Sequence, residues 1–142
     1  MNIKQISIFL ENKKGRLAEV TKYLADNNIN IRALSLADTK DFGVLRLIVD
    51  DYEKCLKVLK EKEFIAQVTD VIAIEIEDRP GGLYKVLKVI EDNNINIEYM
   101  YATVEKNKDS AIVIFRVDDT EKTYEVLKKN NIAFSNGKGL GI

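Results

Sequence analysis

Two short loop sequences hold the residues best suited to binding a small charged molecule. They read Glu11-Asn12-Lys13-Lys14-Gly15-Arg16-Leu17 and Glu77-Asp78-Arg79-Pro80-Gly81-Gly82-Leu83. Glycines just before a helix let backbone N–H groups approach a ligand, and the helix dipole favours a carboxylate there. Asn12 and Asp78 could accept hydrogen bonds from an ammonium group. The alternative is that both loops are ordinary turns, in which Asn12 and Asp78 only cap the helices that follow.

Other polar residues have simpler explanations. Asn30 and Asn96 each begin a predicted strand, where Asn is uncommon, so they either serve a ligand or complete the preceding turn. The acidic pairs 50–51 and 118–119 fit capping boxes in which Asp50 and Asp118 are the N-caps of the next helix. Capping explains both pairs, so we assign them no acid–base or metal chemistry.

The composition narrows the chemistry further. The 142-residue chain has no histidine and a single cysteine, Cys55, which excludes Cys–His nucleophile pairs and zinc sites. We therefore expect no catalytic residue, no metal and no cofactor. The net charge of −1 argues against binding to nucleic acid or to an anionic membrane. No apolar run approaches the ~20 residues of a membrane span. Since a secretory signal and a disulfide pair are also missing from the sequence, we expect a cytoplasmic protein.

An internal repeat predicts how the loops are positioned. The segment Asp-Asn-Asn-Ile-Asn-Ile at 26–31 recurs at 92–97, an offset of 66 residues from position 26 to position 92. The acidic pairs recur at an offset of 68, from position 50 to position 118, so the second copy has two extra residues, expected in the turn 105–109. The repeat predicts two domains, residues 1–69 and 70–142.

Both copies have the same predicted order of elements. The order βαββαβ is the ferredoxin-like arrangement of the α+β class, and we expect two such modules with antiparallel sheets side by side, each covered on one face by two helices. The glycine-rich tail 137–141 is expected to be mobile. Strands are predicted at 6–10, 31–37, 44–49, 64–69, 71–76, 97–104, 111–117 and 132–134, with hairpin turns at 42–43 and 106–109.

These features resemble the ACT domain, a module that regulates enzymes of amino-acid metabolism by binding amino acids. The resemblance rests on Asp-Arg-Pro-Gly-Gly-Leu at 78–83 and on Asn-Ile-Asn-Ile at the start of the second strand, and it spans both copies. Phe-Leu-Glu-Asn-Lys at 9–13 and Glu-Tyr-Met-Tyr at 98–101 are similar to stand-alone tandem ACT proteins.

The resemblance implies two ligand-binding positions in each copy. One lies in the first loop just ahead of Pro-Gly, and the other opens the second strand. They correspond to Asn12 and Asn30 in the first copy, and to Asp78 and Asn96 in the second. The first copy has Lys14-Gly15 in place of Pro-Gly, and the second has Asp78 where binders of small amino acids carry Asn. The two sites are therefore expected to differ.

We predict a regulatory protein without catalytic activity that binds a small-molecule amino acid between the two copies. The alternative is a ligand-free docking module that regulates a separate metabolic enzyme. A homodimer is expected, because apolar and aromatic faces such as that of Tyr99 and Tyr101 are seldom left open. The predicted contacts are Asn12, Gly15, Arg16 and Leu17 from one loop, or Asp78, Gly81, Gly82 and Leu83 from the other, with Asn30 and Asn96 reaching across.

Overall fold

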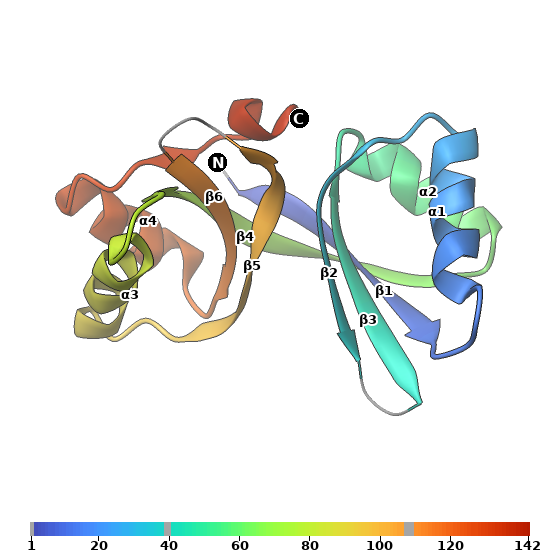
Figure 1. Cartoon of the computed structure of the whole chain (residues 1–142), viewed down its shortest axis with the longest axis horizontal. Helices are drawn as coiled ribbons and strands as arrows, with labels where there is room; N and C mark the ends of the chain where they lie inside the picture. Colours follow the sequence, from blue (N-terminus) through green and yellow to red (C-terminus); the bar gives the residue numbers. More distant parts are fainter. Residues whose placement is uncertain (1, 39–40, 107–109) are drawn as a thin grey trace. The chain divides into compact units, whose positions relative to one another are not determined.

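The computed structural model of the chain describes residues 2–38, 41–106 and 110–142. Along these residues the order strand, helix, strand, strand, helix, strand occurs twice, with one long strand shared by both copies (Figure 1). The predicted α+β fold of two ferredoxin-like βαββαβ modules is therefore confirmed. The elements are β1 (Ile3–Glu11), α1 (Arg16–Asp26), β2 (Ile31–Asp38), β3 (Phe42–Val49), α2 (Tyr52–Glu61), β4 (Ile65–Glu77), α3 (Gly82–Asp92), β5 (Ile97–Lys106), β6 (Ser110–Val117), α4 (Thr120–Lys129), β7 (Phe134–Ser135) and the 3-10 helix η1 (Lys138–Leu140).

The chain divides into two compact units within β4. We call Lys4–Thr69 module 1 and Asp70–Gly141 module 2, the latter unit also including the N-terminal residues up to Ile3. The strands predicted separately at 64–69 and 71–76 form the single strand β4, since no glycine or proline interrupts the chain at the junction. No helix in the described part of the chain combines the length and the apolar content needed to cross a bilayer.

The sheet of each module is antiparallel. In module 1, β3 pairs with β1 from Leu47, opposite Ile6, to Phe42, opposite Glu11. The other edge of β3 pairs with β2. Phe42 and Gly43 are thus strand residues, and their prediction as a hairpin turn is wrong, because both edges of β3 continue to pair at Gly43. In module 2, β6 pairs with β4 and β5, and β7 pairs with the other edge of β4.

Each module has its own hydrophobic core between its helices and one face of its sheet. Alternate strand residues and the apolar stripe of each helix point into this core, as their periodicities of two and 3.6 require. The lone Cys55 is fully buried in the first core, and burial, with Asp50 and Asp51 nearby, raises its pKa to about 12. The fully or nearly fully buried members include Ile6, Ile8, Leu10, Val20, Leu24, Leu45, Leu47 and Leu59 in module 1, and Ile72, Ile74, Ile76, Val86, Ile90, Phe115, Val117 and Leu127 in module 2.

The two acids of each pair accept hydrogen bonds from different parts of the module: one caps the following helix, and the other bonds to the residue just before the module's second strand. Asp51 is the N-cap of α2 and accepts a hydrogen bond from the Lys54 backbone N–H at 3.1 Å. Asp50 instead accepts from the Asn30 backbone N–H at 3.0 Å, and its own N–H donates to the Asn30 carbonyl at 3.1 Å. The prediction that the first acid of each pair is the N-cap is therefore wrong by one residue. The same arrangement recurs in module 2 with Asp119, Lys122, Asp118 and Asn96.

The C-terminal tail is ordered, which corrects the expectation of a mobile segment. Lys138–Leu140 forms η1, and Leu140 is fully buried. The position that a Cβ would take on Gly139 lies 3.4 Å from the Ile112 side chain of β6. Burial of the Leu140 side chain contributes to holding this glycine-rich segment in place.

Candidate functional site

The two predicted ligand loops share one backbone conformation. In module 1 the Arg16 N–H donates to the Lys13 carbonyl at 3.2 Å, and in module 2 the Gly82 N–H donates to the Arg79 carbonyl at 3.0 Å. The residue before each helix is a glycine in the left-handed region, with φ of 85° in module 1 and 87° in module 2. Glycine is favoured in that conformation because glycine has no Cβ.

Neither helix that follows a loop is capped by a side chain. Gly15 and Gly81 occupy the N-cap positions of α1 and α3. The alternative explanation of Asn12 and Asp78 as helix caps is therefore wrong. Within the described residues, the first-turn N–H groups of Leu17 and Ala18, and likewise of Leu83 and Tyr84, have no protein acceptor. These N–H groups can donate hydrogen bonds to a carboxylate at the positive end of the helix dipole.

A cavity of about 60 Å³ lies beside the loop of module 1. Of the four predicted contacts in this loop, Asn12, Arg16 and Leu17 line the cavity, and Gly15 does not. Leu36 and Gly43 also line it and were missed by the prediction. The sequence signal for Leu36 was its place in an alternating strand, but its approach to the loop depends on the pairing of β2 with β3.

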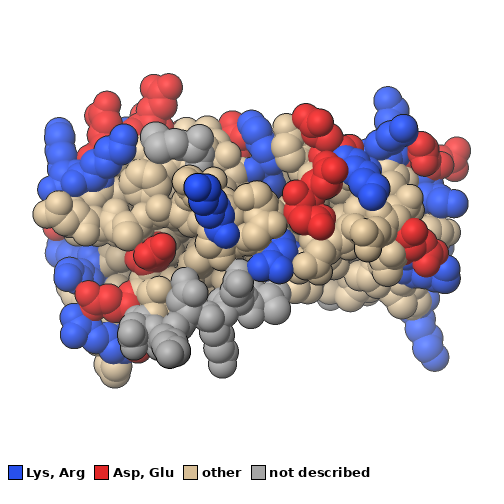
Figure 2. Space-filling view, turned by 90° about the horizontal axis from the view of Figure 1, so that it is seen from above, with Lys and Arg blue, Asp and Glu red and all other residues tan. Residues whose placement is uncertain are grey.

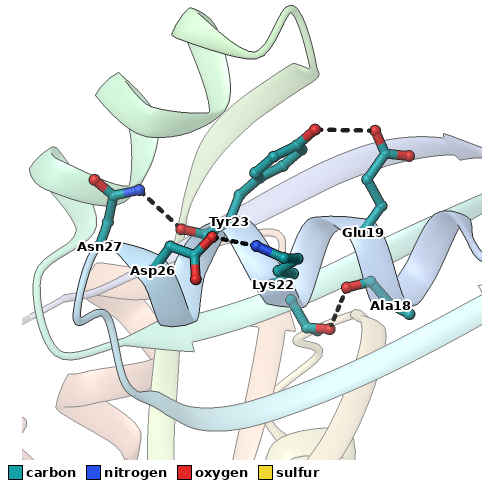
Figure 3. A network of polar contacts seen from close by, with 7 residues as sticks. Ala18, Glu19, Lys22, Tyr23, Asp26 and Asn27 are labelled. Atoms are coloured by element: carbon teal, nitrogen blue, oxygen red, sulfur yellow. Dashed lines mark hydrogen bonds and ion pairs between the residues drawn. The ribbon is translucent and has the colours of Figure 1, made fainter.

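Arg16 is held by its own module. Its guanidinium pairs with Glu19 at 3.0 Å and lies over the Phe64 ring, 4.7 Å from the ring centroid. Glu19 also accepts a hydrogen bond from the Tyr23 hydroxyl at 3.3 Å (Figure 3). Tyr23 in turn meets Phe64 edge to face, with 6.0 Å between ring centroids. An acidic ligand that recruited Arg16 would have to compete with Glu19 and with the aromatic contact.

Each loop contains one internal ion pair between charged residues at equivalent positions. Lys13 pairs with Glu11 at 2.8 Å, and this hydrogen bond lowers the pKa of the Glu11 carboxyl. In module 2 the corresponding pair joins Arg79 and Glu77. Asp78 is exposed and makes no hydrogen bond or ion pair to the described residues, so its carboxylate is available to an ammonium group.

The two predicted positions of a module lie at opposite ends of its sheet. Asn12 follows Glu11, which is opposite Phe42, whereas Asn30 precedes Ile31, which is opposite Val49. Seven residues of strand separate these two ends of β3, which corresponds to roughly 23 Å. One small ligand therefore cannot contact Asn12 and Asn30 of the same module. The same holds for Asp78 and Asn96 by the matching register of module 2.

Asn96 lies beside a separate hollow. It lines an open groove of about 650 Å³ at the C-terminal end of α3, together with Asn94, Ile97 and Asp118. The Asn30 and Asn96 backbone N–H groups are already bonded to the acidic side chains at the ends of β3 and β6. Any ligand contact of these residues is therefore left to their exposed side chains.

The surface carries both signs of charge. Figure 2 shows acidic and basic side chains interspersed over the face in view. That face offers no continuous basic area to a polyanion. Among the residues that the structure describes, no three His, Cys, Asp or Glu side chains are grouped so that they could hold a metal ion.

Comparison with known families identifies one family. The family model described as an ACT domain pair matches residues 1–141. Protein BT0572 from Bacteroides thetaiotaomicron matches with a TM-score of 0.93 and 44% identity, covering 99% of this chain and 96% of that chain. No curated protein matches the sequence.

Two more distant structures share the fold. The ligand-free regulatory subunit of aspartate kinase from Thermus thermophilus matches with a TM-score of 0.66 and 17% identity, over 89% of this chain and 90% of that chain. E. coli aspartokinase III in complex with lysine and aspartate matches with a TM-score of 0.54 and 19% identity, over 90% of this chain and 30% of that chain.

Proposed function

The chain belongs to the ACT domain pair family, and from this we propose that it binds a free amino acid and regulates a separate enzyme of amino-acid metabolism, without catalysis of its own. The observation that carries the proposal is the pair of glycine-capped loops, whose helix N–H groups lack protein acceptors beside Asn12 and Asp78. A zwitterion needs both polarities within a few ångströms, and each loop offers both.

Each loop is proposed to hold the backbone of the amino acid. The carboxylate accepts from the first-turn N–H groups of α1 or α3, and the ammonium lies against Asn12 or Asp78. In module 1 the ligand side chain would lie along Leu17 and Leu36, which line the cavity. In module 2 Gly81, Gly82 and Leu83 are the corresponding contacts. Because Asn30 and Asn96 lie at the far end of their own sheets, we propose that they serve a loop other than that of their own module.

The charge of Asp78 distinguishes the two loops. A carboxylate forms a charge-assisted hydrogen bond with an ammonium, which is stronger than the bond from a neutral amide. We therefore propose that the module 2 loop binds the amino acid more tightly than the module 1 loop.

A homodimer is part of the proposal. Leu34 and Leu36 of β2 pair with core residues Leu47 and Leu45, so they share the helix-covered face of the sheet. They nevertheless remain 47% and 46% exposed. Apolar side chains with this much exposure are suited to a subunit contact. Sedimentation at micromolar concentration is expected to give twice the 16.2 kDa chain mass, and a single 16.2 kDa species would contradict the dimer.

A thermal-shift screen of the proteinogenic amino acids tests the function. Lysine and aspartate come first, since the E. coli aspartokinase III structure contains both. A ligand at 100 times its Kd adds about 2.7 kcal/mol to the free energy of unfolding. Calorimetry with the amino acid found should then show that Asp78→Ala loses about 1.5–3 kcal/mol of binding free energy. Asn12→Ala, its counterpart in module 1, should lose less.

The outcomes separate the two functions. Unchanged affinity in both Asp78→Ala and Asn12→Ala would exclude these loops as the site. If no amino acid stabilises the protein, the alternative is favoured, in which the chain is a docking module that regulates a metabolic enzyme without a small ligand.

A further inference from the structure

We propose that module 2 contains a second ligand site, in a cavity between the first turn of α3 and the α4–β7 loop, and that its ligand is a small aliphatic carboxylate. The cavity has a volume of about 220 Å³. That is on the order of seven times the ~30 Å³ that one water molecule occupies in the liquid, so the ligand is a short-chain acid. The residues on which the argument depends are Gly82, Lys85, Val86, Asn131, Ile132 and Ala133.

The duplication shows what fills the same place in module 1. At the repeat offsets of 66 and 68 residues, Gly82 corresponds to Arg16 and Ile132 to Phe64. In module 1 the Arg16 guanidinium lies 4.7 Å from the centroid of the Phe64 ring. Module 2 lacks both of these side chains, and the Gly82 and Ile132 found at the corresponding positions line its cavity. The cavity is therefore the space that an internal cation and an aromatic ring occupy in the other module.

Gly82 prevents this cavity from being filled by a side chain of α3. A Cβ at Gly82 would lie 2.1 Å from the Glu77 carbonyl oxygen, far inside van der Waals contact. Since the obstacle is a backbone atom, it cannot rotate away. Arg16 does carry a Cβ at the equivalent position, so the module 1 loop leaves more room there. The two loops differ at this point although their turns share the same hydrogen bonds.

The charge of the cavity is reversed relative to module 1. Glu19, which pairs with Arg16 at 3.0 Å, corresponds at the offset of 66 to Lys85. A cationic group in the module 2 cavity would therefore meet an ammonium where Arg16 meets a carboxylate. The Lys85 backbone N–H donates to the Gly81 carbonyl, but its side chain makes no hydrogen bond or ion pair to the described residues, so the ammonium is available to an anion.

The two acids that line the cavity do not cancel Lys85. Glu75 and Glu77 alternate along β4 with Ile74 and Ile76, whose side chains are in the core under the helices. By strand alternation the two carboxylates project from the opposite face of the sheet. Glu77 is in addition paired with Arg79. We therefore infer that the two acids border the cavity with their backbone, as the Glu77 carbonyl does beside Gly82, so that Lys85 supplies the charge on the helix side.

The remaining lining suits an aliphatic chain. Val86 is in the core, and Ile132 packs against the same core cluster. Asn131, in the left-handed region at φ 53°, shapes the loop around it. An ammonium on the ligand would lie near Lys85 and be repelled, so a plain carboxylate is preferred over an amino acid. The site does not rest on the proposed amino-acid function, since Gly82 is the only residue named for both.

Three probes with related carbon skeletons test the site on the full chain. They are 3-methylbutanoate (valine without its amine), 2-methylpropylamine (valine without its carboxylate) and valine. Backbone amide NMR should show that 3-methylbutanoate saturably shifts Gly82, Lys85, Asn131 and Ala133, while the amine does not. Shifts near Asn12, Leu17 or Asp78 would report the amino-acid loops instead, so failure of one site is distinguishable from failure of the other.

Variants of one helix provide the matched control. Lys85→Glu, which restores the charge found in module 1, should weaken 3-methylbutanoate binding by about tenfold or more. Lys88→Glu removes a neighbouring exposed lysine, paired with Asp92 at 2.7 Å, and should change affinity by less than about twofold. Ile132→Phe, which restores the aromatic side chain, should abolish binding.

Three results would overturn the proposal. They are the absence of saturable shifts at the four amides, equal binding of the amine or of valine there, and equal effects of Lys85→Glu and Lys88→Glu.

Discussion

The two loops of this protein share a backbone and differ in chemistry. Each turns through a left-handed glycine into a helix that no side chain caps. At matched positions, however, module 1 has Asn12 and Arg16, and module 2 has Asp78 and Gly82. The comparison teaches that the turn depends on one glycine in each loop, whereas the proposed ligand chemistry depends on the side chains around it, which differ between the modules. The two copies therefore keep the same backbone frame and differ in the side chains proposed to bind ligands.

Matched core substitutions are expected to lower the free energy of unfolding the most, and by similar amounts in the two modules. Ile8 and Ile74 are both fully buried at equivalent positions of β1 and β4. Ile8→Ala and Ile74→Ala should each lower the free energy of unfolding by about 2–5 kcal/mol, because each leaves a cavity in a packed core. Urea denaturation measures both. If one of them costs less than about 1 kcal/mol, the two cores are not equivalent.

Substitutions at Gly82 and at the equivalent Arg16 should lower the free energy of unfolding by different amounts, both smaller than those of the core substitutions. Gly82→Ala places a methyl group against the Glu77 carbonyl and should lower the free energy of unfolding by about 1–3 kcal/mol, the range for overpacking. Arg16→Ala is the control at the equivalent position, where a Cβ is already accommodated. Its cost should remain near 1 kcal/mol, from the lost ring contact and ion pair. Equal chemical-denaturation midpoints for the two variants would contradict the inference that a Cβ is accommodated in module 1 and not in module 2.

The helix caps should again behave alike in both modules. Asp51→Ala and Asp119→Ala each remove an N-cap acceptor and should cost about 1 kcal/mol in free energy of unfolding. Thermal denaturation followed by circular dichroism would measure this. Asp51→Asn and Asp119→Asn serve as controls, since Asn caps as well as Asp. A loss in Asp51→Asn as large as in Asp51→Ala would assign the effect to charge and not to capping.

The Lys13–Glu11 pair gives the smallest expected effect. Its hydrogen bond lowers the pKa of Glu11 in the folded protein. A lowered carboxyl pKa contributes stability that is present above the usual Glu value and is lost as the pH falls through the folded value. Because the pair is exposed, the change in stability should be slight. NMR titration of Glu11 in Lys13→Ala should show its pKa rising towards the ordinary value, and no rise would show that Lys13 is not the cause.

Much of the fold was predictable because it depends on local patterns. The repeated segment at 26–31 and 92–97 required two similar modules, and the apolar periodicities placed the strands and helices. The errors occurred where partners distant in the sequence decide the outcome. Gly43 suggested a turn, but β1 and β2 pair with it from both sides. Similarly, Asp50 accepts a hydrogen bond from Asn30 and does not cap α2. This could be known only once the end of β3 was placed beside the start of β2.

By itself the sequence determined the doubled α+β architecture, the two glycine turns and the absence of histidine chemistry, since these depend on residue types and short spacings. The residues proposed to bind an amino acid remain a prediction from it. Only the tertiary structure decided that Arg16 lies over Phe64 in module 1 and that Gly82 and Ile132 border a cavity in module 2. Such contacts join residues far apart in the chain, and a shift of about one ångström in the backbone decides whether a side chain fits.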